Sequence, residues 1–117
     1  MTDHTAPFIS VVVPTHDAPV LLPAVLASLA TQSYPQERAE IIVVDDGSPD
    51  ASQAALEQYD GTLPLKPVLL EANGGRARAR NAGIRAADGD LIVFLDDDMT
   101  VPDDFLSAHA RFHQVHA

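Results

Sequence analysis

The sequence of 117 residues contains no cysteine, which excludes a disulfide framework and a thiolate metal site and leaves no redox marker of its compartment. Basic residues are scarce, since seven lysines and arginines stand against 17 aspartates and glutamates, for a net charge of -10. A chain this acidic is not expected to bind nucleic acid or an anionic membrane surface through its overall charge. Any phosphate ligand must therefore be held by local groups.

Long apolar runs are also missing. The longest fall far short of the roughly 20 residues that a membrane helix needs. The segment Met1–His4 lacks the basic start and apolar core of a signal peptide. We therefore expect a soluble cytoplasmic domain with no transmembrane segment, while membrane attachment through regions outside this chain stays open. With 46% hydrophobic residues and no repeat, linker or low-complexity tract, residues 1–117 are expected to form one domain.

Four apolar runs predict the strands of a sheet. The run Leu91–Leu95 has five consecutive apolar residues and predicts a strand buried on both faces. The other strands are predicted at residues 8–13, closed by Pro14, at residues 41–44, and, more weakly, at residues 65–71, which Pro67 interrupts.

Helices are expected after each strand. Apolar residues at i, i+3, i+4 and i+7 predict one apolar stripe on a helix over about residues 20–32. Ser48 as N-cap, with Pro49 in the first turn, predicts a helix that ends near Tyr59. The remaining two helices are predicted over residues 76–87 and from Thr100 toward the C-terminus. This alternation predicts an α/β fold, with a mainly parallel, Rossmann-like sheet and helices on both faces.

Carboxylates directly follow two of the predicted strands. They are Asp45 and Asp46 after the second strand, and Asp96, Asp97 and Asp98 after the fourth. Three neighbouring carboxylates favour a cation between them, and Mg²⁺ or Mn²⁺ binds carboxylate oxygens together with the phosphates of a nucleotide. Because parallel sheets bind ligands beyond the carboxyl ends of their strands, Asp17 and Asn73 are expected at the same rim. The alternative for Asp45 and Asp46 is a helix-capping turn, and the alternative for Asp96, Asp97 and Asp98 is a solvated acidic turn.

Four of the seven basic residues lie in one predicted helix. On a helical wheel, Arg76 and Arg80 lie beside the sheet-facing stripe, where a guanidinium needs a carboxylate or phosphate partner. Ligand contact and an ion pair with the site's aspartates both stay open. Arg78 and Arg85 point the opposite way and are expected to be solvated surface charges. The preceding Asn73-Gly74-Gly75 predicts either a tight turn or bare N–H groups that face an anion.

Histidine gives weaker signals. His109 and His113 share a helical face and His116 follows them, but no third ligand lies alongside, so we expect a structural role. For His16, in the first loop, contact with a ligand and packing within the loop both stay open. The sequence has no GxSxG elbow and no Ser-His-Asp order, so it does not support a serine hydrolase.

Taken in order, four stretches closely resemble family 2 glycosyltransferases. They are Val11–Thr15, Ile42–Ser48, Asn73–Gly75 with Ala79–Gly83, and Phe94–Asp98. The resemblance covers nearly the whole chain. It implies a GT-A fold, a nucleotide-diphosphate-sugar donor, with a UDP-sugar favoured, and inversion at the anomeric carbon.

The resemblance also implies roles for individual residues. It places Pro14, Thr15 and Asp17 at the base and ribose, gives the hydrogen bond to the nucleobase to Asp45, and leaves Asp46 close by. The donor set is completed by Asn73, Arg76 and Arg80, and by the DxD-like triplet, with Asp96 and Asp97 on the ribose side and Asp98, with Asp96, as ligands of Mn²⁺ or Mg²⁺.

In this family the general base and the acceptor pocket lie in a later half, so no residue of this chain is nominated as the base. We therefore expect the donor-binding half of an enzyme, truncated after the DxD strand and the following helix. The sheet would then have an exposed edge that invites self-association. A non-catalytic nucleotide-sugar-binding module is one alternative. A phosphoacceptor receiver domain is another, although it places its acidic pair after the first strand.

Overall fold

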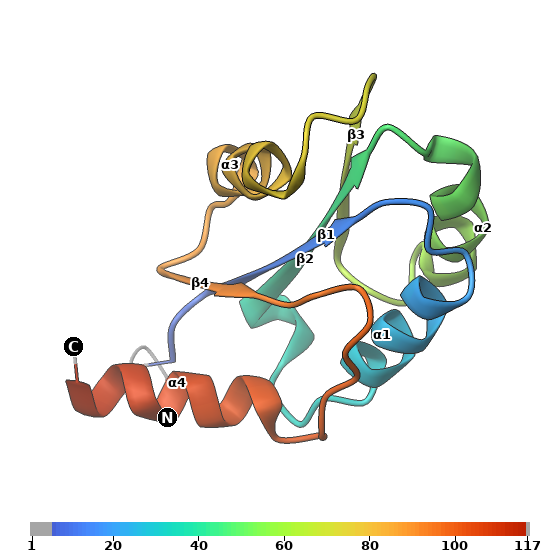
Figure 1. Ribbon diagram of the computed structural model, residues 1–117. Coiled ribbons are helices and arrows are strands. Elements are labelled where there is room, and N and C mark those ends of the chain that lie inside the picture. The colour runs from blue at the N-terminus through green and yellow to red at the C-terminus, as the bar shows by residue number, and fades with distance from the viewer. Residues whose placement is uncertain (1–5, 117) are drawn as a thin grey trace.

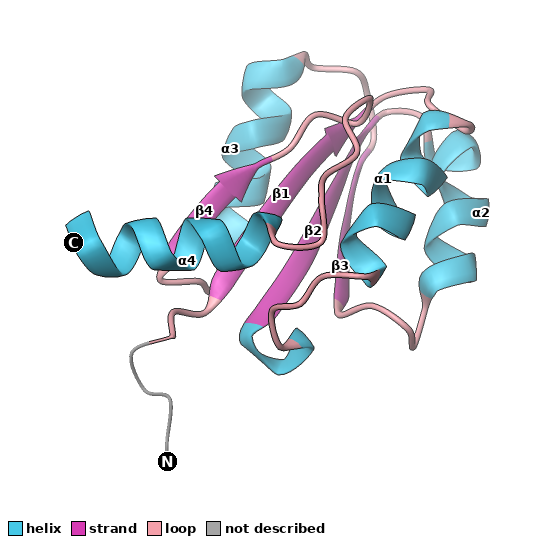
Figure 2. Ribbon diagram, turned by 90° about the horizontal axis from the view of Figure 1, so that it is seen from below, coloured by secondary structure: helices cyan, strands magenta, loops and turns pink. Residues whose placement is uncertain are grey.

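The computed structural model describes residues 6–116, apart from the side chains of Pro49 and residues 114–116. The segment Met1–His4, considered above for a signal peptide, lies outside this range. Within the described residues, four strands alternate with four α-helices (Figure 1). All strands pair in parallel in the order β3-β2-β1-β4 and run side by side in one direction (Figure 2). The predicted parallel α/β architecture is confirmed.

The element bounds follow the predicted segments closely, except at the last helix. The strands are β1 (Ile9–Thr15), β2 (Ala39–Asp46), β3 (Leu65–Leu70) and β4 (Leu91–Phe94). The helices are α1 (Leu21–Ala30), α2 (Pro49–Tyr59), α3 (Arg76–Ala86) and α4 (Phe105–His116), and a short 3-10 helix, η1 (Gln36–Arg38), precedes β2.

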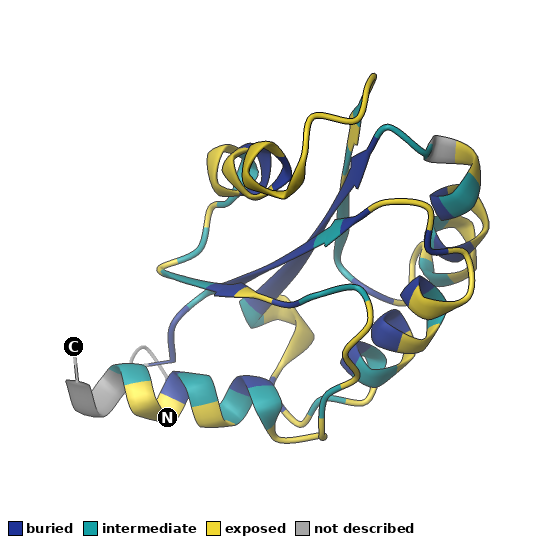
Figure 3. Cartoon of the chain, in the orientation of Figure 1, coloured by how far each residue is buried: buried dark blue, intermediate teal, exposed yellow. Residues whose placement is uncertain are grey.

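Helices cover both faces of the sheet, as predicted (Figure 1). Successive side chains of β1 point to opposite faces, so Val11 and Val13 pack in the core formed with α1, α2 and α4, whereas Val12 packs under α3. The strands β1 and β2 are central and buried along nearly their whole length (Figure 3). Each fully buried apolar side chain contributes about 1.5–3 kcal/mol to folding. The two central strands therefore give the strand ends a rigid base.

Pro14 lies inside β1 rather than after it, and this position opens the sheet at one end. The N–H of Leu95 donates to the carbonyl of Val12, so Val12 and Pro14 direct their backbone groups toward β4. The pairing of β1 with β4 ends at Val12 opposite Phe94. Pro14 therefore needs no partner on that side, and β1 and β4 separate toward their carboxyl ends.

The strand β4 is an edge strand, and the prediction that Leu91–Leu95 is buried on both faces is wrong for part of it. Val93 and Leu95 are buried, but Leu91 and Ile92 are half-buried and the side chain of Phe94 is exposed. The sequence could not reveal this, because the order β3-β2-β1-β4 places β4 beside one strand only.

Helix α4 begins at Phe105, later than the start predicted from Thr100. The intervening segment is held by bonds to the end of α1. Asp103 accepts hydrogen bonds from the hydroxyl of Thr31 at 3.1 Å and from the backbone N–H of Ser33 at 2.8 Å. These tertiary contacts fix Asp103 in a turn, so Thr100 does not cap the helix.

Candidate functional site

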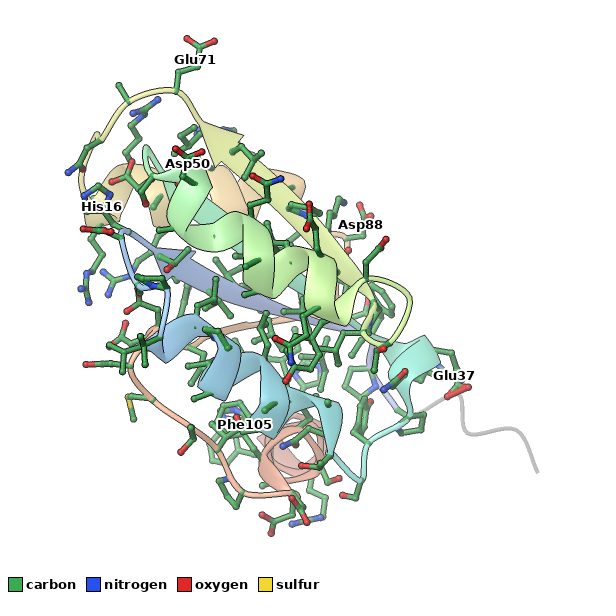
Figure 4. All side chains as sticks on the ribbon, turned by 90° about the vertical axis from the view of Figure 1, so that its right-hand side faces the viewer. His16, Glu37, Asp50, Glu71, Asp88 and Phe105 are labelled. Atoms are coloured by element: carbon green, nitrogen blue, oxygen red, sulfur yellow. The ribbon has the colours of Figure 1, made fainter. Side chains whose placement is uncertain are left out.

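The carboxyl ends of three strands and the start of α3 surround a pocket of about 310 Å³. Its lining comprises Pro14, Thr15 and His16 from the end of β1, Asp46 from β2, Asp97 after β4, and Asn73, Gly75, Arg76 and Ala79 from the start of α3. The strand order reverses between β1 and β4, where these strands separate. Open parallel sheets bind ligands at such a point, so this pocket is the candidate site. Figure 4 shows His16 at this end of the molecule and Glu37 at the opposite end.

Thr15 and Asp97 join the two strands that separate here. Thr15 is 3% exposed, and its hydroxyl donates to Asp97 Oδ2 at 2.9 Å. The backbone N–H of His16 donates to the same oxygen at 3.4 Å. These bonds hold the acidic loop after β4 against the end of β1. The structure thus brings together Pro14, Thr15 and Asp97, as predicted for the site.

Asp46 faces the pocket and holds the turn before α3. Its Oδ1 accepts the N–H of Gly74 and its Oδ2 the N–H of Gly75, both at 2.9 Å. The sequence predicted that these N–H groups could face an anion. In the structure they bind the carboxylate of Asp46 instead of a free anion. The turn alternative therefore describes Asn73-Gly74-Gly75, with Gly75 at a φ of 93° that favours glycine.

Asp45 is fully buried in the turn before α2 and does not line the pocket. Its Oδ1 accepts the backbone N–H of Ser48 at 2.6 Å, and its Oδ2 accepts the hydroxyl of Ser52. Asp45 and Asp46 are successive residues of β2, so their side chains point to opposite faces. The structure thus places Asp45 in the turn that leads into α2, as the alternative to a binding role expected, and it places Asp46 at the pocket, where the sequence predicted Asp45 as well. Ser52, which the sequence did not single out, holds the second oxygen of Asp45.

His16 connects two sides of the pocket. Its Nδ1 lies 2.7 Å from the backbone carbonyl of Asp46, which can only accept, so Nδ1 carries the proton. The other ring nitrogen, Nε2, then accepts from the side-chain amide of Asn73 at 3.4 Å. The ring of His16 packs between the loops and also lines the pocket, so its contact with a ligand stays a prediction.

Asp17 lies beside the pocket rather than on its wall. Its backbone N–H donates to the hydroxyl of Ser48 at 2.7 Å, and its φ of 50° lies in the left-handed region. This conformation turns the chain away from β1 toward α1. The side chain of Asp17 is exposed.

The arginines of α3 differ from the helical-wheel expectation. Arg76 lines the pocket and pairs with Asp96 at 3.3 Å, but its side chain is 62% exposed. Arg80 is also exposed and lines a neighbouring groove beside Phe94. Neither guanidinium is buried, because α3 packs on the sheet through small residues, among them Ala79, whose short side chains leave the flanking arginines in solvent.

Arg78 is exposed, as predicted, but its side chain also makes contacts that the sequence did not predict. Its guanidinium donates to the carbonyl of Ala72 at 2.6 Å and lies 4.0 Å from Asp46 Oδ1. A helical wheel shows only which face of a helix a residue occupies. It does not show that the β3–α3 loop folds back alongside that face, so no sequence signal pointed to this contact.

The predicted metal ligands, Asp96 and Asp98, do not surround a common point in the way that a preformed metal site would. Asp98 is exposed, and the carboxylate of Asp96 is paired with Arg76. Among the described residues, no group of three histidine, cysteine or acidic side chains is arranged to hold a metal ion. The donor chemistry still fits Mg²⁺ or Mn²⁺, which in nucleotide enzymes needs one or two carboxylates and completes its shell with phosphates and water.

His109 and His113 of α4 do not line this pocket. His109 packs edge-on against Phe105, with ring centroids 4.8 Å apart. This contact fits the structural role predicted for it. The side chain of His116 lies outside the described part of the chain.

Residues 10–116 match the family model of glycosyl transferase family 2. The chain belongs to this family. The resemblance noted in the sequence is confirmed, and membership of this family replaces the receiver-domain alternative.

Two curated family 2 relatives illustrate the similarity. The poly(ribitol-phosphate) β-N-acetylglucosaminyltransferase TarS of Staphylococcus aureus is 36% identical over 108 residues, covering 92% of this chain and 19% of TarS. The validoxylamine A glucosyltransferase of Streptomyces hygroscopicus is 39% identical over 114 residues, covering 93% of this chain and 25% of that enzyme. The chain thus spans a quarter or less of the length of these relatives.

Solved structures of glycosyltransferases show the same fold. Residues 1–349 of S. aureus TarS in complex with UDP-GlcNAc give a TM-score of 0.87 at 36% identity, over 92% of this chain and 31% of that one. The mannosyltransferase PcManGT from Pyrobaculum calidifontis, in complex with GDP-Man and Mn²⁺, gives 0.81 at 29% identity, over 89% of this chain and 32% of that one. The fold is therefore GT-A.

No helix in residues 6–116 has both the length and the apolar character that crossing a membrane requires. The location expected from the sequence stays a prediction.

Proposed function

We propose that this chain binds the nucleotide diphosphate of a sugar donor in the pocket, as the donor-binding part of an inverting glycosyltransferase. The observation that carries the proposal is the pocket at the strand-order reversal, where Asp46, Asp97 and Arg76 converge on one opening. The complexes of TarS with UDP-GlcNAc and of PcManGT with GDP-Man support it. We favour a UDP-sugar, because TarS, the more similar of the two, binds UDP and UDP-GlcNAc.

For the nucleobase and ribose we propose the side of the pocket formed by Pro14, Thr15, Asn73 and Asp46. An ionised carboxylate has about four acceptor positions. Only two on Asp46 are filled by Gly74 and Gly75, since each oxygen accepts one of their N–H groups. Asp46 can therefore accept an N–H of the base without releasing the loop. Asp17 borders this end, where its exposed carboxylate can reach the ribose.

For the diphosphate we propose the opposite side, formed by Arg76 and the Asp96–Asp98 loop. Asp98, with Asp96, would hold Mn²⁺ or Mg²⁺, which when bound supplies Lewis-acid stabilisation to the leaving diphosphate. Arg76 is exposed enough to exchange its bond with Asp96 for one with a phosphate oxygen. Arg80, beside Asp96 in the neighbouring groove, would add positive charge to the same side.

Catalysis needs a base for the acceptor hydroxyl, and we propose none of the described residues for it. The chain alone is then expected to bind a donor without transferring the sugar. A non-catalytic binding module would behave in the same way with a donor alone. Testing transfer by the longest natural form of the protein separates the two functions.

Titration calorimetry of the chain with UDP, UDP-GlcNAc and GDP-Man, each with and without Mn²⁺, tests the proposal. We expect binding that Mn²⁺ strengthens and that Asp98→Ala makes independent of Mn²⁺. The matched control is Asp60→Ala, which removes an exposed carboxylate at the end of α2, away from the pocket. Absence of binding to the whole panel would reject the donor site. Equal Mn²⁺ enhancement in wild type and Asp98→Ala would reject the metal ligand.

We also propose that the edge of β4 pairs with a second copy of the chain. Val93 and Leu95 direct their backbone groups toward β1, so those of Ile92 and Phe94 point outward from the edge. The exposed side chains of Phe94 and Met99 add apolar surface beside them. An edge of this kind is a template for strand pairing.

A further inference from the structure

The β3–α3 loop, residues 71–75, forms one wall of the pocket through Asn73 and Gly75. Two contacts hold it from the sheet side. The carboxylate of Asp46 accepts the N–H groups of Gly74 and Gly75 at 2.9 Å. The ring of His16 meets the side chain of Asn73 at 3.4 Å.

Arg78 holds the same loop from the helix side. Its Nη1 donates to the carbonyl of Ala72 at 2.6 Å. Its aliphatic stem lies on the backbone of Gly74, where an added Cβ would come within 2.1 Å of Arg78 Cδ. The guanidinium also lies 4.0 Å from Asp46 Oδ1, the oxygen that accepts the Gly74 N–H. Arg78 and Asp46 therefore clamp Gly74 between them.

We infer that Arg78 is a positioning residue of the donor site: it holds the loop against Asp46, so that Asn73 and Gly75 keep their places on the pocket wall. This inference rests on the proposed donor binding. Arg78 is absent from the lining of the pocket, so it acts through the loop. Its side chain is 44% exposed, so its charge attraction to Asp46 is weak, and the hydrogen bond to Ala72 and the contact with Gly74 carry the effect.

A loop that is already ordered binds a ligand more tightly, because the ordering need not occur at binding. Removal of Arg78 leaves Ala72 and Gly74 without their outer contact and frees the loop in the absence of ligand. We expect Arg78→Ala to weaken UDP binding roughly three- to tenfold. The thermal unfolding midpoint should barely change, since the residue is exposed and packs on one loop.

Arg85→Ala is the matched control. Arg85 is an exposed arginine of the same helix, nearly two turns further on, so the substitution removes the same charge without touching the loop. Calorimetry with UDP should give wild-type affinity for this variant. Arg78→Lys keeps the charge but loses the planar fork and should restore only part of the affinity.

Gly74→Ala reaches the same contact from the other side. The three atoms nearest to the added methyl group all belong to Arg78, so alanine at this position displaces that side chain. We expect Gly74→Ala to weaken UDP binding about as much as Arg78→Ala does, and the double variant to be no weaker than either single one.

Amide hydrogen exchange at Gly74 and Gly75 in the ligand-free chain gives a readout that does not need a donor. It should be faster in Arg78→Ala and unchanged in Arg85→Ala. Wild-type exchange in Arg78→Ala, wild-type affinity in that variant, full recovery with lysine, or an equal loss of affinity in Arg85→Ala would each overturn the inference. If the wild-type chain binds no nucleotide, the proposed function fails, while the exchange measurement still decides whether Arg78 orders the loop.

Discussion

Thr15 donates its hydroxyl to the carboxylate of Asp97, and this bond of 2.9 Å joins residues that are 82 positions apart in the sequence. It links the end of β1 to the loop after β4, beyond the point where the two strands stop pairing. The acidic loop is therefore placed by a hydrogen bond to the neighbouring strand, and not only by the strand that it follows. This relationship makes the position of the loop sensitive to one hydroxyl group.

Thr15→Val removes that hydroxyl and keeps the shape of the side chain. We expect the free energy of unfolding to fall by about 1 kcal/mol, since one hydrogen bond to a charged group is lost while Asp97 remains partly accessible to water. Nucleotide binding should also weaken. Urea unfolding and calorimetry measure the two effects. Thr62→Val, at an exposed threonine, is the control, and equal stability losses in both variants would contradict the prediction.

Asp45→Asn and Asp46→Asn should differ in their effect on nucleotide binding. Asparagine at position 45 loses an acceptor in the buried turn before α2, so the fold should lose about 1–3 kcal/mol of stability and keep its affinity for UDP. At position 46 the same change removes one of the acceptors that hold Gly74 and Gly75, so it should also lower stability, but it lies at the pocket and should weaken UDP binding as well. Thermal unfolding and calorimetry of both variants test this. Stronger loss of binding in Asp45→Asn than in Asp46→Asn would restore the role first predicted for Asp45.

Gly89→Ala should destabilise the amino end of the sheet without changing the pocket. The added Cβ would lie 2.5 Å from Ser10 Oγ and 2.7 Å from the Ser10 backbone nitrogen. Ser10 Oγ cannot move aside freely, since it accepts the Gly89 N–H at 2.8 Å and donates to Glu40 at 2.7 Å. We expect a loss of about 1–3 kcal/mol from overpacking.

Chemical unfolding measures that loss, and UDP affinity of the folded variant should equal that of wild type. Gly61→Ala is the comparison variant: no atom lies near the Cβ position there, so its stability loss reports the strain of a φ of 81° without overpacking. A marked loss of UDP affinity in folded Gly89→Ala would contradict the separation between the two ends of the sheet.

Phe94→Lys tests the edge of β4. A lysine on an exposed edge strand opposes pairing with another strand, because its charge would have to be desolvated or repelled. We expect wild type to associate with increasing concentration and Phe94→Lys to stay monomeric in sedimentation velocity. The control is Val20→Lys, at an exposed residue that precedes α1 and lies away from the edge. A monomeric wild type over the whole concentration range would reject the pairing.

Local sequence patterns predicted the elements of this protein well. The β-branched runs, the apolar stripe of α1 and the position of Pro49 at the start of α2 each act within a few residues, so strands, helices and the parallel sheet could be read from them. The motifs also identified the family, because they combine residue types with spacing. The start of α4 escaped this reasoning, since bonds from Asp103 to the end of α1 decide it.

The sequence by itself determined the fold class, the family and the rim where the acidic residues gather. Tertiary structure alone decided which acidic residue serves which purpose. Asp45 and Asp46 are neighbours in the chain, but the pleat of β2 turns one into the core above α2 and the other into the pocket. The contact of Arg78 with the β3–α3 loop also depends on tertiary structure, because this loop folds back beside the helix. Such contacts depend on strand order and loop path, which only the folded chain defines.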